Sequence, residues 1–258
     1  MPALKADLPD HLYWLTEKVE QLVRPGAFLV HSERHKKTRQ PLTPAPQGST
    51  FTNGEADFPV DAPWVANAKS VPSMAGNGWM SHPYDGESFY LQLNLEDIPA
   101  EIRPQYPQLP AVGVVWVTID LSDSDKGWQG FAYWDPRPAS EIQWLPRRET
   151  ASQPTASHFV LRDTLTFATD ATLPEISKDY REGGLCGDYD NWRQDHYGGG
   201  WRDGNVQVGG WLHPIQGDTD EARKTLLVAL EDQGFGDCGA IYLHYSPERG
   251  FFVQVWTH

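Results

Sequence analysis

The sequence predicts a strand-rich α+β protein, a single domain built from two pseudo-symmetric three-stranded repeats plus an N-terminal helix. Residues 78–86 (GWMSHPYDG) match residues 210–217 (GWLHPIQG) with one residue missing from the second copy. Each copy is followed by an apolar run that ends in Glu-Asp, and then by two more apolar runs that each open with glycine. Matched features in one order indicate an internal duplication.

The duplication sets the expected boundaries along the chain. Residues 1–77 hold the N-terminal helix and loops, and residues 78–134 form the first repeat. Residues 135–205 connect it to the second repeat, which spans residues 206–258.

An amphipathic helix is predicted over residues 7–24, followed by a short strand over 27–31. Apolar residues recur there at intervals of three and four, with charged residues between them, and Pro25-Gly26 is expected to end the helix. Residues 31–50 contain the one basic segment and several prolines, which favours a solvated loop. Four apolar residues are expected to anchor the loops of residues 51–77 in the core: Phe51, Phe58, Trp64 and Val65.

The first repeat is predicted to form three strands. Residues 89–95 alternate apolar and polar side chains, which predicts a strand with one buried face. Residues 112–121 are more continuously apolar and predict a central strand covered on both faces, with 128–134 pairing back on it. The connector is predicted to hold strands near 142–145 and 158–167 and a helix over 173–182.

Residues 183–205 (GGLCGDYDNWRQDHYGGGWRDGN) mix glycine, acidic and aromatic residues. Glycine permits unusual backbone angles, so we expect a loop. Acidic residues beside Tyr and Trp suit a surface that binds a cationic partner. The residues predicted to bind such a partner are Asp188, Tyr189, Asp190, Trp192, Asp195, Tyr197 and Trp201.

Several of these segments carry a family resemblance. LQLNL, GVVWVTID, VGGWLHPIQGD and GDCGAIYLHYSPERGFFVQVW resemble the YwqG-like family, bacterial proteins of unknown function. The resemblance covers about residues 73–258 and is greatest over 206–258. It implies a fold for the chain and no catalytic residues.

Charge and cysteine usage limit the classes of partner. The formal net charge is −14, which disfavours nucleic acid and anionic membranes and favours a cationic protein partner. No apolar run is long enough to span a membrane, and Cys186 and Cys238 belong to no C-x-x-C motif. A cytoplasmic protein is therefore predicted.

Two sets of repeated residues are candidates for chemistry. His82 and His213 occupy matched positions before proline, and the Glu-Asp pairs contribute Asp97 and Asp232. Together these four residues would form an alternative cleft between the repeats, where histidines and carboxylates divide acid and base roles. A duplicated turn also retains its turn residues for structural reasons, and that interpretation is favoured here.

No nucleophile, phosphate-loop or metal-ligand motif accompanies them, so neither a metal nor a cofactor is predicted. The sequence favours a non-catalytic binding protein, for example an acidic immunity-type antagonist of a bacterial toxin. The alternative is a small-ligand-binding protein or hydrolytic enzyme whose site lies between the repeats.

Overall fold

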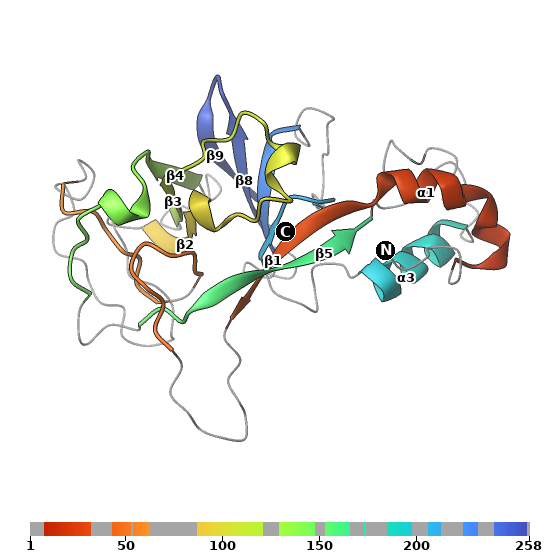
Figure 1. Cartoon of the computed structure of the whole chain (residues 1–258), viewed down its shortest axis with the longest axis horizontal. Helices are drawn as coiled ribbons and strands as arrows, with labels where there is room; N and C mark the ends of the chain where they lie inside the picture. Colours follow the sequence, from red (N-terminus) through yellow and green to blue (C-terminus); the bar gives the residue numbers. More distant parts are fainter. Residues whose placement is uncertain are drawn as a thin grey trace.

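The computed structural model places two antiparallel sheets against each other and a pair of helical segments beside them (Figure 1). The described residues are 8–31, 43–52, 54–61, 87–120, 129–147, 153–165, 173, 185–197, 206–212, 224–231 and 240–256. Within them the fold is α+β and strand-rich, as the sequence predicts. All strand pairings in these ranges are antiparallel.

The larger sheet has six strands in the order β5-β1-β6-β7-β8-β9. Their bounds are β1 Arg24–His31, β5 Ser157–Thr164, β6 Val206–Val208, β7 Leu226–Glu231, β8 Ala240–Ser246 and β9 Gly250–Trp256. The smaller sheet has three strands in the order β2-β3-β4. These are β2 Glu87–Asn94, β3 Val114–Asp120 and β4 Gln129–Asp135. β2-β3-β4 and β7-β8-β9 each form an antiparallel three-stranded meander, the second within the larger sheet. The pseudo-symmetry of the two repeats stays a prediction.

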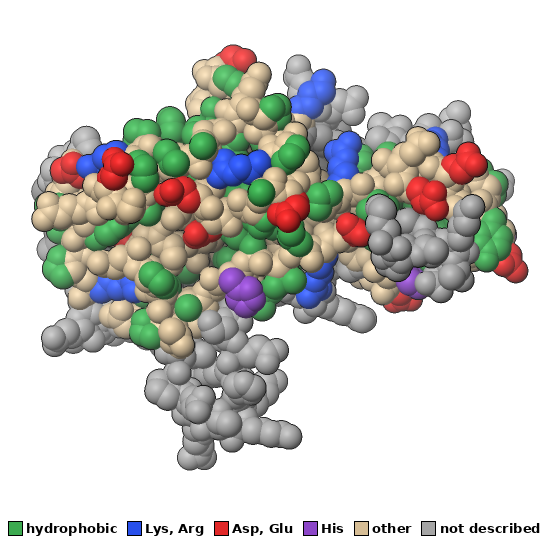
Figure 2. Space-filling model, in the orientation of Figure 1, with side chains coloured by type: hydrophobic (Ala, Val, Ile, Leu, Met, Phe, Trp, Pro, Cys, Tyr) green, Lys and Arg blue, Asp and Glu red, His purple; other side chains and the backbone are tan. Residues whose placement is uncertain are grey.

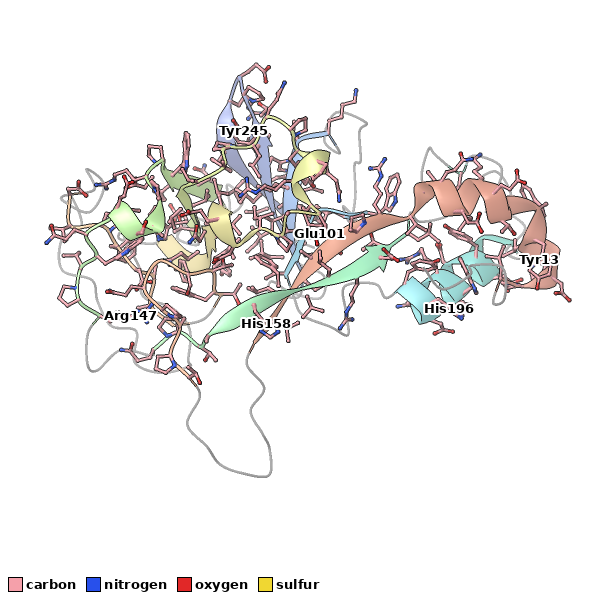
Figure 3. The ribbon with its side chains drawn as sticks, viewed as in Figure 1. Tyr13, Glu101, Arg147, His158, His196 and Tyr245 are labelled. Carbon is pink, nitrogen blue, oxygen red and sulfur yellow. The ribbon has the colours of Figure 1, made fainter. Side chains whose placement is uncertain are left out.

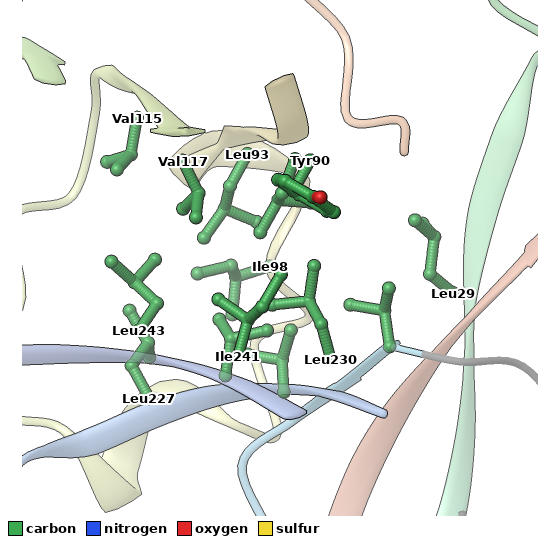
Figure 4. Packing of buried hydrophobic residues seen from close by; sticks show 14 of the residues in the cluster. Leu29, Tyr90, Leu93, Ile98, Val115, Val117, Leu227, Leu230, Ile241 and Leu243 are labelled. Carbon is green, nitrogen blue, oxygen red and sulfur yellow. The ribbon is translucent and has the colours of Figure 1, made fainter. Parts of the chain in front are cut away.

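The core lies between the two sheets. Leu227, Leu230, Ile241 and Leu243 of the larger sheet face Leu93, Val115 and Val117 of the smaller one, and Ile98 fills the space between them (Figure 4). All of these side chains are at most 3% exposed. Their burial is the main favourable contribution to the stability of the sheet body.

The first strand of the smaller sheet differs from its prediction. In β2 the polar Gln92 and Asn94 are buried together with the apolar Leu91 and Leu93. Both faces are therefore covered, because segments 43–52 and 54–61 lie over the face that was expected to meet water. The predicted Glu-Asp strand end is also wrong in the first repeat, since Leu95–Asp97 forms the short 3-10 helix η3.

The connections carry further short helices: η4 Arg103–Gln105 and η5 Ala139–Glu141. No strand forms near residues 142–145, where Trp144 makes only an isolated bridge to Pro59. Strand β5 confirms the strand predicted near 158–167 and lies at the edge of the larger sheet, so its Asp163 is exposed. Leu173 is buried, and the rest of the helix predicted over 173–182 lies outside the described residues.

The N-terminal helix is confirmed in two parts, η2 Asp10–Leu15 and α1 Thr16–Leu22. It ends at Leu22, before the predicted stop, and Pro25-Gly26 belongs to β1 instead. Gly26 is needed there for packing, because a Cβ atom would lie 2.7 Å from the Cγ2 of Thr164 on β5.

A second helix, α3 Leu185–Tyr197, lies beside η2 and α1. The ribbon of β1 and β5 leads from the sheets to these helices (Figure 1). We call residues 8–23 and 185–197 the helical arm. The arm has its own apolar cluster, to which Leu165 and Leu173 also belong although they lie outside the arm. Its buried members are Leu8, Leu12, Leu15, Val19, Leu165, Leu173, Tyr189 and Trp192.

Candidate functional site

The predicted acidic-aromatic loop is a helix for most of its length. Residues 185–197 form α3, in which the aromatic side chains recur at spacings of three and four. Trp192 lies 6.0 Å from Tyr189 and 5.5 Å from His196 between ring centroids. These contacts follow the geometry of one helix face, which a glycine-rich loop would not maintain.

Burial removes the two central aromatics from any partner surface. Tyr189 is fully buried and Trp192 is 6% exposed, both inside the cluster of the helical arm. Their prediction as binding residues is therefore wrong, because they face the arm's interior. Tyr197 is partly buried against the same cluster, and desolvation raises its pKa to about 12, with the carboxylates of Asp163 and Glu20 adding to the shift.

The acidic residues of α3 stay at the surface. Asp188 forms an ion pair with His11 of η2, with Nε2 3.0 Å from Oδ2. Asp190 lies 3.5 Å from the guanidinium of the buried Arg193. Asp195 is exposed, and Trp201 lies outside the described residues. The acidic residues of the predicted surface are therefore accessible, whereas Tyr189 and Trp192 are buried.

Exposed aromatic side chains are found instead on the neighbouring segment, η2. Trp14 is 58% exposed and Tyr13 is 44% exposed. Tyr13 lies at the outer end of the arm (Figure 3). Asp10 and Glu17 are exposed as well, at positions three or four residues from this pair. In the 3-10 helix η2 a spacing of three aligns Asp10 with Tyr13, and Glu17 follows Trp14 by three residues. These four exposed residues therefore form two adjacent rows, outside the buried stripe of Leu12, Leu15 and Val19.

We call Asp10, Tyr13, Trp14 and Glu17 the acidic-aromatic face. Several carboxylates lie at the surface of the arm in the view of Figure 2. Among the described residues of the arm, the only lysine or arginine side chains are Lys18, which is partly buried, and Arg193, which is buried. The periodicity that predicts the buried stripe would also have identified this face, as its complement.

The alternative cleft is tested only at one residue. His82, His213 and Asp232 lie outside the described residues. The carboxylate of Asp97 accepts hydrogen bonds from the backbone N–H of Thr50 at 2.9 Å and from its hydroxyl at 2.8 Å. This Asp97 therefore fixes segment 43–52 to the end of β2, a structural role.

The second Gly-Trp corner is partly described. Gly209 and Gly210 have φ of +64° and +72°, and a Cβ on Gly210 would lie 2.4 Å from the Oγ1 of Thr164. That hydroxyl accepts a hydrogen bond from the backbone N–H of Trp211 at 2.8 Å. At this corner, glycine is required by backbone conformation and by close packing, which supports the structural interpretation of the motif.

Among the described residues of the sheet body, the most buried charged group is Asp57, which is 1% exposed. Arg147 donates to both of its carboxylate oxygens, from Nε at 2.6 Å and from one terminal nitrogen at 2.8 Å. The backbone N–H of Gly48 and the side-chain amide of Gln92 donate to Oδ2 as well. A carboxylate with four donors is already satisfied, so this cluster holds the outer segments on β2 and β3.

His244 on β8 is a buried titratable group of the second meander. It is 3% exposed, its ring stacks on Phe252 with centroids 4.8 Å apart, and its Nδ1 lies 3.1 Å from the hydroxyl of Thr225. Burial lowers the pKa of His244 to about 4, with the charge of Arg249 adding to the shift and the side chain of Gln254 opposing it. His244 is therefore neutral near pH 7, and no carboxylate partner accompanies it among these contacts.

In the described ranges, no group of three or more His, Cys, Asp or Glu side chains is placed to hold a metal ion. None of the helices found there has the length and apolarity to cross a membrane. Cys238 lies outside the described residues, so a pairing with Cys186 is untested.

Comparison with protein-family models and with curated proteins gives no match to this chain. The resemblance to the YwqG-like family accordingly stays a prediction. Among the described residues, the acidic-aromatic face is the surface that combines the most exposed large aromatic side chains with carboxylates.

Proposed function

We propose that this chain is a non-catalytic, cytoplasmic binding protein whose partner is a cationic protein. Its specific form is an acidic immunity-type antagonist of a bacterial toxin. The acidic-aromatic face is the observation that carries the proposal, because it combines two large exposed rings with exposed carboxylates in adjacent rows of the N-terminal helical segment.

Energetics supports this use of the face. Trp and Tyr are enriched among the few residues that dominate binding energy at protein interfaces. Carboxylates around them add charge complementarity, which speeds association with a basic partner and disfavours acidic ones. The net charge of −14 extends the same field over the whole chain.

The position of the face also fits a binding role. The arm has its own apolar cluster, and the ribbon of β1 and β5 holds it beside the sheet body. Tyr13 points away from that body at the end of the arm (Figure 3). A partner can therefore reach the face without displacing any part of the sheets.

The test is binding to the basic proteins encoded next to this chain's gene. Titration calorimetry should show a complex that weakens as salt is raised, because exposed charges are screened. The double variant Asp10→Asn with Glu17→Gln should weaken it by about tenfold, which is the loss of roughly two favourable charge contacts. Co-expression of the unaltered chain should relieve any toxicity of that partner.

A matched control removes the same charge elsewhere. Glu101 and Glu141 are exposed on the sheet body, and the double variant Glu101→Gln with Glu141→Gln also removes two carboxylates. It should leave the affinity within about twofold. If no basic neighbour binds and none is neutralised, the proposed function is wrong; equal losses in both double variants would reject the arm as the binding surface.

A further inference from the structure

The ring of Trp14 is the most exposed large apolar side chain among the described residues, at 58%. Its one polar atom is already used, since Nε1 donates to the backbone carbonyl of His11 at 3.0 Å. What Trp14 can offer a partner is therefore the flat face and the hydrocarbon edge of the indole. A flat aromatic face attracts cations, because the ring quadrupole is negative there.

The chain itself shows which cation its aromatic rings accept. The guanidinium of Arg24 lies 4.1 Å from the ring centroid of Trp211, and that of Arg249 lies 3.9 Å from Phe252. Arginine stacks well because its guanidinium is planar and weakly hydrated, whereas the ammonium of lysine is a compact and strongly hydrated charge. The exposed ring of Trp14 is suited to the same kind of contact from outside.

Two carboxylates are positioned to hold such a guanidinium. Asp10 precedes Trp14 by four residues and Glu17 follows it by three, and both are exposed. A guanidinium stacked on the ring still has its N–H donors free at the edge, where these carboxylates can accept them. Lysine would gain the charge attraction and lose most of the stacking.

We propose that Tyr13 and Trp14, flanked by Asp10 and Glu17, bind an arginine-rich segment of the partner protein. This inference rests on the proposed function and adds the chemistry that selects the partner. It predicts that the ring of Trp14 adds a preference for arginine over lysine, beyond the preference that bidentate pairing with carboxylates alone would give.

Fluorescein-labelled octa-arginine and octa-lysine peptides test the inference directly. Anisotropy titrations at low salt should give an affinity about two- to fivefold higher for octa-arginine, the gain expected of one exposed stacking contact. Trp14→Ala should bring the two affinities together. Trp14→Phe, which keeps an aromatic ring, should retain part of the difference.

Trp134→Ala is the matched control, because Trp134 is also exposed, at 41%, and lies on β4 outside the arm. It should leave the preference for arginine unchanged, and circular dichroism of each variant establishes that the fold is retained. Equal affinities for the two peptides, or an unchanged preference in Trp14→Ala, would overturn the inference.

The two proposals fail separately. If a basic partner binds and depends on Asp10 and Glu17 while arginine and lysine peptides bind alike, the proposed function stands and arginine selection is wrong. If octa-arginine is preferred through Trp14 and no basic neighbour binds or is neutralised, the arginine-binding face stands and the antagonist function is wrong.

Discussion

The two meanders, β2-β3-β4 and β7-β8-β9, share one hydrogen-bonding pattern and differ in what covers their outer faces. In both, the first pair of strands has a register shift at the matching place, between Phe89 and Leu91 and between Leu226 and Val228. The structure thus matches Phe89 with Leu226, whereas the sequence repeat matches Leu91 with Leu226. A shift of two residues keeps every side chain on its face, so both alignments predict the same core.

The outer faces carry different chemistry at matched positions. Gln92 pairs with Trp116 in the first meander, and Ala229 pairs with Tyr242 in the second. Gln92 receives a hydrogen bond from the indole of Trp116 and donates to Asp57, so the first outer face is a polar network under covering segments. The two meanders therefore have similar strand pairing but different chemistry on their outer faces, and the outward side chains account for the difference.

The largest effect is expected where the polar network holds a buried charge. Arg147→Met leaves the carboxylate of Asp57 without its cation at a site that is 1% exposed. Breaking one side of a buried ion pair costs about 3 to 5 kcal/mol, because the remaining charge is buried unpaired. Urea unfolding of the chain should show this loss of unfolding free energy. The described part of the second meander has no buried ion pair of this kind to lose.

A double variant separates the effect of the ion pair from the effect of side-chain packing. Asp57→Asn with Arg147→Met removes both charges and should recover a substantial part of the loss. Arg137→Met removes a half-buried arginine that pairs with the exposed Asp61 and the buried Asp135, and it should cost less than Arg147→Met because the guanidinium of Arg137 is more exposed to water. A loss in Arg137→Met as large as in Arg147→Met would contradict the assignment of the buried pair.

The second meander is expected to respond to acid through His244. Its folded pKa of about 4 lies below the ordinary value of 6.5, so the unfolded chain binds the proton more readily between these values. Stability is therefore full above about pH 6.5 and falls as the pH drops toward 4. The upper limit of this loss is about 3 to 4 kcal/mol, because the two pKa values differ by about 2.5.

His244→Gln should flatten the dependence of unfolding free energy on pH in this window. His158→Gln alters an exposed histidine on β5 and should keep the slope of the unaltered chain. Urea unfolding measured at several pH values compares the two. An unchanged slope in His244→Gln would assign the acid sensitivity to other groups.

The seam between the meanders gives a smaller effect. Strands β4 and β9 contact each other across the two sheets, and a Cβ on Gly130 would lie 2.2 Å from Cγ1 of Val253. Gly130→Ala should therefore destabilise the chain by about 1 to 3 kcal/mol, through overpacking. Thermal unfolding measures the change, and adding Val253→Ala should restore part of it.

Gly187 supplies the opposite case. A Cβ there meets nothing within 4 Å, and the residue lies in α3. Gly187→Ala should stabilise the chain by up to about 1 kcal/mol, because alanine loses less backbone entropy in a helix. If both glycine variants destabilise equally, the loss at Gly130 cannot be assigned to the seam.

The sequence alone determined the frame of the molecule. Alternating and continuous apolar runs, separated by glycine, predicted the central strand β3 and its return strand β4. The apolar stripe of Leu12, Leu15 and Val19 predicted the N-terminal helix and its buried side. Such periodicities are local, so they survive without any knowledge of what each face will meet.

Tertiary structure decided which residues of that frame remain accessible. Asp57 and Arg147 are 90 positions apart in sequence, and no local pattern indicates that they pair. In α3, glycine and acidic residues favoured a loop, although the spacing of Tyr189, Trp192 and His196 already suited a helix. Packing against η2 and α1 then buried the rings of Tyr189 and Trp192. The candidate surface moved to Tyr13 and Trp14 because burial depends on contacts between distant segments, which composition does not specify.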